Sequence, residues 1–189
     1  LRLAREEAAL EESEPFTLDR LEQFALRRET IDSLLHGRPA EQLFPALAAT
    51  GRLPQPPFDR LTFSDLAADA AALAEPLHEL LAEPRVPVAV DLALGPWQLT
   101  GQLSDLCRAG RVVWRSGARK AADLVELWVL HLALHLVSPP DLERRSTYLN
   151  RDRNGAPQWF VLGPVADPEP LLRDLLEGFR QGLTRPLPF

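Results

Sequence analysis

The chain has 189 residues, 46% of them hydrophobic, which suits one domain with a substantial buried core. Its net charge of −6 argues against a free-standing nucleic-acid-binding protein, because contacts to backbone phosphates dominate that affinity. The single cysteine, Cys107, excludes an internal disulfide and fits a reducing, cytoplasmic compartment, and no apolar run approaches the ~20 residues of a membrane span. The sequence contains no Met, and we expect it to be part of a longer protein.

The first part of the sequence has helical patterns only. Residues 1–15 are typical of a charged helical leader or linker that ends at Pro15, and residues 16–84 of the helical part of a domain. Thr17 is the expected N-cap of the first helix, and Pro76 should kink or split the last one. We expect these helices over residues 18–36, 40–49 and 64–81.

The second part, residues 86–189, should contain a sheet core and further helices. Strands alternate apolar and polar residues, and two stretches do so cleanly, over residues 86–92 and 97–103. A third strand is expected over residues 111–116, after a turn at Ala109-Gly110. Together these patterns predict three consecutive strands joined by tight turns.

A helix expected over residues 118–137 is apolar nearly all round, so it should be buried on more than one side. Residues 141–155 are polar and basic, and we expect a loop there. A last strand over residues 158–162 and a helix that begins at Pro168 complete the chain. The final helix should bury a stripe made of Leu171, Leu172, Leu175, Leu176 and Phe179.

Short stretches in a fixed order carry a resemblance that covers most of the chain. They are Glu14-Pro15-Phe16, Leu18-Asp19, Leu26-Arg27, Val90-Asp91-Leu92, Leu99-Thr100-Gly101, Leu103, Val113-Trp114-Arg115, Leu127-Trp128, His131-Leu132, Glu177-Gly178-Phe179-Arg180, Gly182 and Pro186-Leu187. With these residues the chain resembles the RecC C-terminal domain family, and its strands and helix resemble the core of the PD-(D/E)XK nuclease superfamily. The resemblance implies an α/β fold with a restriction-endonuclease-like core, a central mixed sheet flanked by helices.

The positions that carry catalysis in that superfamily are altered in this sequence. Active members place an Asp three residues after a Gly on the second strand, and an acid and a Lys two residues apart on the third. Those acids hold Mg²⁺, which activates water and clamps the scissile phosphate. The matching positions hold Ser104, Val113 and Arg115, none of which suits a cation. We therefore expect no catalytic residue, metal or cofactor.

An active Mg²⁺ nuclease that uses displaced acids stays open as an alternative. Asp91 and Asp105 are the candidates. Asp105 is one residue past the expected position, so strand alternation predicts that it points to the opposite face of the sheet from Ser104. Asp91 has no acidic partner on the third strand.

Basic residues gather locally although the whole chain is acidic. They are the candidates for DNA binding, with solvated surface charges as the simpler interpretation. One group surrounds the third expected strand and consists of Arg108, Arg111, Arg115, Arg119 and Lys120. The other lies in the expected loop and consists of Arg144, Arg145, Arg151 and Arg153.

Two histidines on the apolar helix, His131 and His135, have the spacing of two metal ligands on one helix face. A zinc protease would also have Glu directly after the first His, where this chain has Leu132. We interpret the pair as structural, at a helix edge or a subunit contact.

The family resemblance implies a place in a RecBCD helicase–nuclease, exodeoxyribonuclease V, which processes double-strand DNA ends for recombinational repair. The implied partners are RecB-type and RecD-type subunits, together with double- and single-stranded DNA within that complex, and no membrane. The implied role is a non-catalytic scaffold that guides DNA strands. A protein-interaction module that never touches DNA is the second alternative, motivated by the net negative charge.

Overall fold

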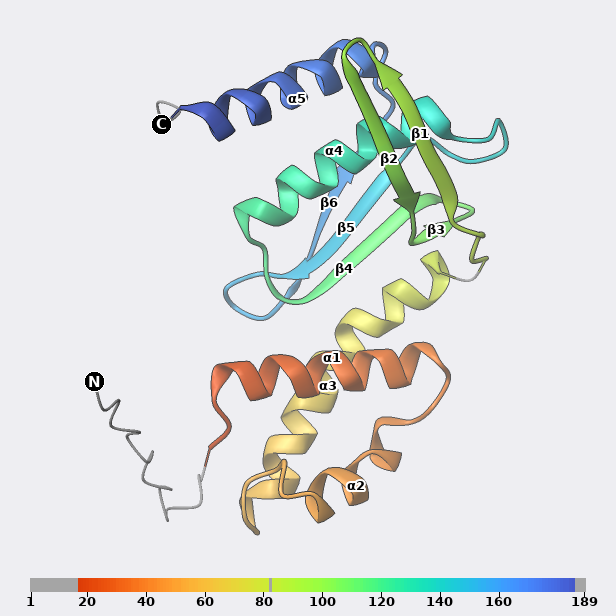
Figure 1. Cartoon of the computed structure of the whole chain (residues 1–189). Coiled ribbons are helices and arrows are strands. Elements are labelled where there is room, and N and C mark those ends of the chain that lie inside the picture. The colour runs from red at the N-terminus through yellow and green to blue at the C-terminus, as the bar shows by residue number, and fades with distance from the viewer. Residues whose placement is uncertain (1–16, 82, 186–189) are drawn as a thin grey trace, which may run out of the picture. The chain divides into compact units, whose positions relative to one another are not determined.

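The computed structural model describes residues 17–81 and 83–185 (Figure 1). The expected leader, residues 1–15, lies outside the described residues. The chain divides into two compact units, Leu1–Ala70 and Ala71–Phe189. None of the helices in the described ranges is both long and apolar enough to cross a membrane.

The described part of the first unit is helical. It contains α1 (Arg20–Leu35), the 3₁₀ helix η1 (Ala40–Gln42), α2 (Phe44–Ala49) and the first half of α3 (Phe58–Leu80). Asp19, and not the expected Thr17, caps α1: its carboxylate accepts from the Glu22 N–H at 2.7 Å, and the Glu22 carboxylate accepts from the Asp19 N–H at 2.9 Å. This reciprocal pair is a capping box, and it explains why α1 begins three residues later than Thr17.

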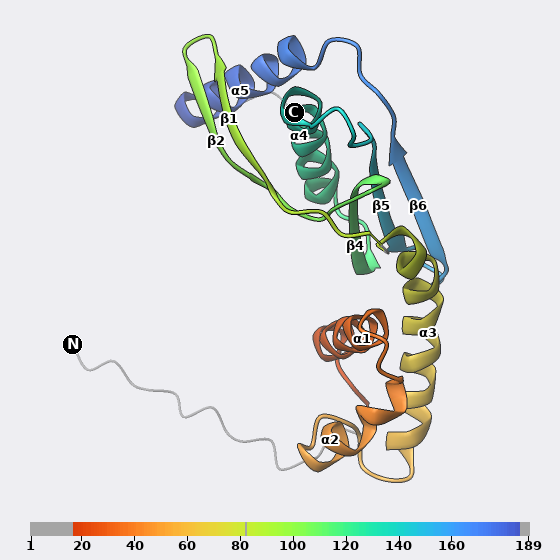
Figure 2. The same cartoon turned by 90° about the vertical axis from the view of Figure 1, so that its right-hand side faces the viewer.

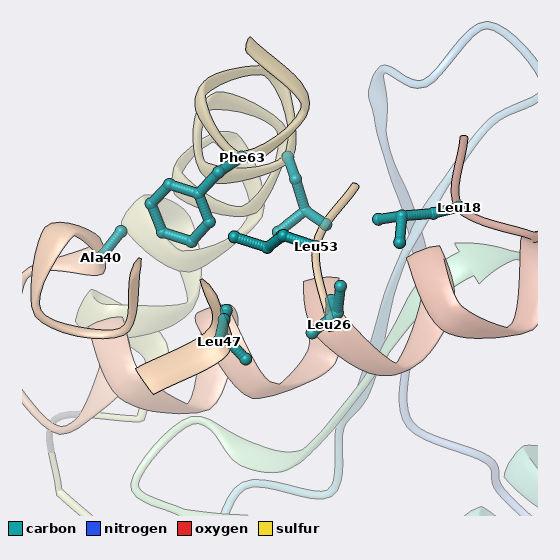
Figure 3. Packing of buried hydrophobic residues seen from close by; sticks show 7 residues of the cluster. Leu18, Leu26, Ala40, Leu47, Leu53 and Phe63 are labelled. Atoms are coloured by element: carbon teal, nitrogen blue, oxygen red, sulfur yellow. The ribbon is translucent and has the colours of Figure 1, made fainter. Parts of the chain in front are cut away.

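Leucine and aromatic side chains from all of these helices form the core of the first unit (Figure 3). Leu53, in the proline-rich connector before α3, is part of this core, so the connector is anchored by burial. The α3 helix begins six residues before the expected residue 64 and continues through Pro76 without a break. The core consists of Leu18, Leu26, Ala40, Leu47, Leu53, Phe63 and Leu66.

The second unit contains two sheets and confirms the expected α/β class with a mixed sheet flanked by helices. The strands are β1 (Val88–Leu94), β2 (Trp97–Leu103), β3 (Leu106–Cys107), β4 (Gly110–Ala118), β5 (Ser146–Arg151) and β6 (Pro157–Leu162). In the described residues β1 and β2 form an antiparallel pair of their own, and the larger sheet has the order β3-β4-β5-β6. Within it β4 and β5 are parallel, and the other pairs are antiparallel.

The three expected strands exist as β1, β2 and β4, but they are not consecutive, because the short strand β3 lies between β2 and β4. The chain leaves β2 at Leu103 and turns at Asp105, whose φ of 60° lies in the left-handed region. The two-residue strand β3 then pairs with the start of β4. The turn at Ala109-Gly110 exists, but it joins β3 to β4 rather than β2 to β4.

The expected loop over residues 141–155 is also wrong, because it contains the buried strand β5. Because most of its side chains are polar, the sequence does not indicate that this strand is buried. Ser146 hydrogen-bonds the buried His131 ring at 2.9 Å, and the Tyr148 hydroxyl donates to Asp123 at 2.9 Å. Internal partners thus allow a polar sequence to form a central strand.

Helix α4 (Ala121–Val137) is buried on more than one side, as its composition predicted. It lies between the β1–β2 pair and the larger sheet, and it also contacts α5 (Pro168–Thr184) (Figure 2). Leu134 packs in a cluster with Val90 and Leu103, whereas Leu132 packs with Leu94 and Leu172.

The stripe expected on α5 is only partly buried. Leu172 is 1% exposed, and Leu175 and Leu176 pack against its cluster. Leu171 is 40% exposed and Phe179 is 64% exposed, so burial of these two is wrong. Only the side of α5 that meets α4 and the β1–β2 pair finds apolar neighbours in the described chain.

Candidate functional site

Ser104, where the resemblance to active nucleases would place an Asp, is exposed at the end of β2. Its hydroxyl donates to the Asp105 carboxylate at 3.0 Å. The prediction that Asp105 points away from Ser104 is wrong, because strand alternation stops at Leu103 and Asp105 has a left-handed backbone. The Val112 N–H donates to the Asp105 carbonyl at 2.9 Å, which holds this turn beside the start of β4.

Val113 and Arg115, at the other two positions, lie on β4 and face α4. Val113 is opposite Tyr148 in the register, and Tyr148 hydrogen-bonds Asp123 of α4. Arg115 Nη1 lies 3.6 Å from the Asp123 carboxylate, and Arg115 Nε donates to the Ala118 carbonyl at 3.1 Å. Arg115, a cation at the expected lysine position, thus pairs with Asp123, and Val113 provides no carboxylate at the expected acid position.

Asp123 is the carboxylate that organises this end of the sheet. It accepts from the Tyr148 hydroxyl at 2.9 Å and from the Lys120 N–H at the start of α4 at 2.8 Å. Partial burial opposes its ionisation, but these hydrogen bonds and the charge of Arg115 lower its pKa. Burial, followed by the hydrogen bond to Asp123, raises the pKa of Tyr148. Asp123 is therefore ionised, and its carboxylate is held by hydrogen bonds and an ion pair within the chain.

These residues do not fit a Mg²⁺ ion. Ser104 offers a hydroxyl, Val113 no ligand, and Arg115 a positive charge. The alternative acids are far apart: Asp91 lies opposite Thr100, and the end of β2 lies roughly 10 Å farther along the strand, still short of Asp105. Direct Mg²⁺–oxygen bonds are about 2 Å long. In the described ranges, no three His, Cys, Asp or Glu residues form a group that could hold a metal ion.

In the folded sheet, the members of each basic group of the sequence lie apart. Because β4 and β5 are parallel, with Arg111 opposite Ser146 and Ala118 opposite Arg151, each group is divided between the two ends of these strands. The amino ends carry Arg108, Arg111, Arg144 and Arg145. The carboxyl ends carry Arg115, Arg119, Lys120, Arg151 and Arg153.

Several of these candidates have protein partners. Arg111 is 4% exposed, with Nη2 at 3.9 Å from Asp105, and burial lowers its pKa although Asp105 and Glu126 act in the opposite direction. Arg108 pairs with Glu83 at 3.2 Å.

At the carboxyl ends, the Arg119 guanidinium lies 5.5 Å from the centre of the Phe160 ring, and Arg151 Nε donates to the Gly155 carbonyl at 2.7 Å. The remaining candidates are exposed and are Lys120, Arg144, Arg145 and Arg153.

His131 and His135 are buried inside the second unit and not at a helix edge. His131 Nε2 lies 2.9 Å from the Gly163 carbonyl, which can only accept, so Nε2 carries the proton and Nδ1 accepts from Ser146. By the same logic His135 Nδ1 donates to the His131 carbonyl, and Nε2 accepts from the Val165 N–H, both at 2.9 Å. Burial lowers the pKa of His131. The two rings fix the connector between β6 and α5 onto α4.

A recess that the sequence analysis missed lies between the end of α3 and the sheet face opposite α4. Its volume is about 370 Å³. Trp159 and Val161 of β6 form one wall and are 41% and 43% exposed. The alternation of β6 places both on one face, which is the only sequence signal for it. The lining consists of Pro76, Glu79, Leu80, Ala109, Arg145, Thr147, Trp159 and Val161.

Comparison with known proteins gives one family. The model described as RecC C-terminal domain matches residues 1–189. The chain is 28% identical over 184 residues to the RecBCD enzyme subunit RecC of Escherichia coli (strain K12), covering 96% of this chain and 16% of that protein. It is 19% identical over 132 residues to the protein of the same name from Buchnera aphidicola subsp. Acyrthosiphon pisum (strain APS), covering 70% of this chain and 12% of that protein. The chain thus spans less than a fifth of the length of these relatives, and it belongs to the RecC C-terminal domain family.

Proposed function

We propose that this chain is a non-catalytic domain of a RecC-type subunit in a RecBCD-type helicase–nuclease, in the cytoplasm, acting in double-strand-break repair and recombination. The match to the RecC C-terminal domain over the whole chain carries the proposal. Both relatives are named RecBCD enzyme subunit RecC. The domain would scaffold RecB-type and RecD-type subunits and guide DNA strands.

The proposed core has the PD-(D/E)XK nuclease fold but no nuclease activity. The mixed sheet, with α4 connecting the parallel strands β4 and β5, supports the first part. The second part rests on residue types: Ser104 and Val113 have no carboxylate, and Arg115 holds the nearby Asp123 carboxylate in an ion pair. The partners of Asp123 leave its carboxylate committed to the fold.

Co-purification tests the assignment to the complex. The full-length parent of this chain, expressed with RecB-type and RecD-type proteins of the same genome, should elute with both as one species. Separate elution of the three proteins would refute it. The interaction-module alternative also predicts co-elution and differs only in the absence of any DNA contact.

The displaced-acid nuclease is tested on the full-length parent without its partners. Linear DNA with Mg²⁺ or Mn²⁺ should stay intact, because Asp91 and Asp105 cannot share an ion. If cleavage is seen, the double variant Asp91→Asn, Asp105→Asn decides its origin. Cleavage that this variant abolishes would establish the alternative, whereas unchanged cleavage points to a contaminant.

A further inference from the structure

We propose that the sheet face opposite α4 binds single-stranded nucleic acid along its exposed strand β6, with Trp159 as a stacking platform and Arg145 and Arg153 as phosphate contacts at its two ends. We call it the outer face. The inference rests on the proposed function and names a surface on which such a domain would hold a strand.

The register and the contacts of α4 define the two faces of this sheet. Ser146 and Tyr148 hydrogen-bond side chains of α4, so they face the helix. Neighbouring residues of a strand point to opposite faces, so Thr147 lies on the outer face, together with Val161, its partner in the register. The same rule places Trp159, the partner of Leu149 in the register, on the outer face as well. Trp159 keeps 41% of its surface exposed and Val161 beside it 43%.

The recess beside Trp159 has the shape and polarity that suit a nucleobase. Apolar groups of Pro76, Leu80 and Val161 provide contact for a flat ring. Glu79 and Thr147 provide polar atoms that can bind the edge of a base. The carboxylate of Glu79 would repel a phosphate, so it favours the base, and not the backbone, inside the recess.

Positive charge stands at both ends of this face. Arg145 directly precedes β5, and Arg153 follows it by two residues, so a six-residue strand, roughly 20 Å long, separates them. Both are exposed, and the structure pairs neither with an acidic side chain in the residues it describes. An aromatic platform between basic groups is the arrangement that binds single strands without reading their sequence.

Charge decides between a strand and a peptide. An apolar side chain of a partner protein would also fill the recess, but the arginines at both ends complement a polyanion that runs along β6. The chain as a whole has a net charge of −6, so this local positive charge is not a general property of its surface.

The test uses the full-length parent protein and a fluorescent oligothymidine of twelve nucleotides. The change Trp159→Ala should weaken binding about tenfold, since one stacked base supplies energy of that order. Trp159→Phe should restore most of the affinity. Arg145→Glu and Arg153→Glu should each weaken binding and reduce the salt dependence by about one phosphate contact. Phe179→Ala, which removes another exposed aromatic ring, and Arg173→Glu on α5 are the matched controls.

Cross-linking in the assembled complex provides the second readout. An oligonucleotide with iodouracil should cross-link to the peptide that contains Trp159, and Trp159→Ala should abolish the product. Normal affinity of Trp159→Ala, Arg145→Glu and Arg153→Glu, or a cross-link that Trp159→Ala does not change, would overturn the inference. Loss of a partner subunit with unchanged DNA binding would assign this face to a protein instead. In either case co-purification of the unchanged parent still tests the proposed function separately.

Discussion

The stability of this domain should fall below neutral pH because of His131. The side chain is fully buried and hydrogen-bonded as a neutral ring, and burial lowers its pKa below the ordinary 6.5. His135 packs edge-on against it, 4.5 Å away between ring centres. The unfolded chain therefore binds a proton that the folded chain excludes. The stabilisation is complete above pH 6.5 and is lost as the pH falls from there toward the folded pKa.

The size of the effect follows from one proton. Below pH 6.5 the free energy of unfolding can fall by on the order of 1 kcal/mol for each pH unit. Urea unfolding of the chain and of His131→Asn, at steps from pH 8 to pH 5, measures it. Both curves contain the other histidines, so their difference isolates His131. The variant should be less stable at pH 8, and the difference should shrink as the pH falls. A constant difference, or one that grows toward pH 5, would refute the reasoning.

Three further changes should lower stability by different routes, all read by chemical denaturation. Leu132→Ala removes a fully buried side chain that packs against both Leu94 and Leu172, and should cost about 2–5 kcal/mol; less than 1 would mean that the core closes around the gap. Tyr148→Phe should cost about 1–2 kcal/mol and raise the pKa of Asp123 seen by NMR, whereas an unchanged titration would contradict the described hydrogen bond. Gly110→Ala would place a methyl group against the Arg145 carbonyl at a φ of 98°, so wild-type stability would be unexpected there.

Sequence patterns predicted the elements whose buried positions hold apolar residues. The strands β1 and β2 alternate because one face of this pair meets α4, and α4 is apolar all round because both of its sides are covered. The strand β5 was missed because its buried polar atoms are satisfied by side chains far along the chain, such as His131 for Ser146. Such pairing cannot be read from local composition.

The candidate site was likewise only partly predictable from the sequence. The residue types at Ser104, Val113 and Arg115 could be read directly from the sequence, but the Asp123 partner of Arg115 could not. Neighbouring arginines in the sequence, such as Arg145 and Arg151, lie at opposite ends of one strand. Linear clustering of charge therefore did not predict which residues share a surface. Trp159 could be identified as a candidate only because the structure places it in the lining of the recess.

The position of Leu132 has a consequence for synthesis on the ribosome. Its cluster joins Leu94 and Leu172, so residues from β1, α4 and α5 must all be present before this side of α4 is covered. A nascent chain that has emerged only as far as α4 would expose this side of the apolar helix to solvent until the residues from β5 to α5 had followed. Premature stop codons before Pro168 should therefore yield aggregating fragments that chaperones retain, and not shortened native domains.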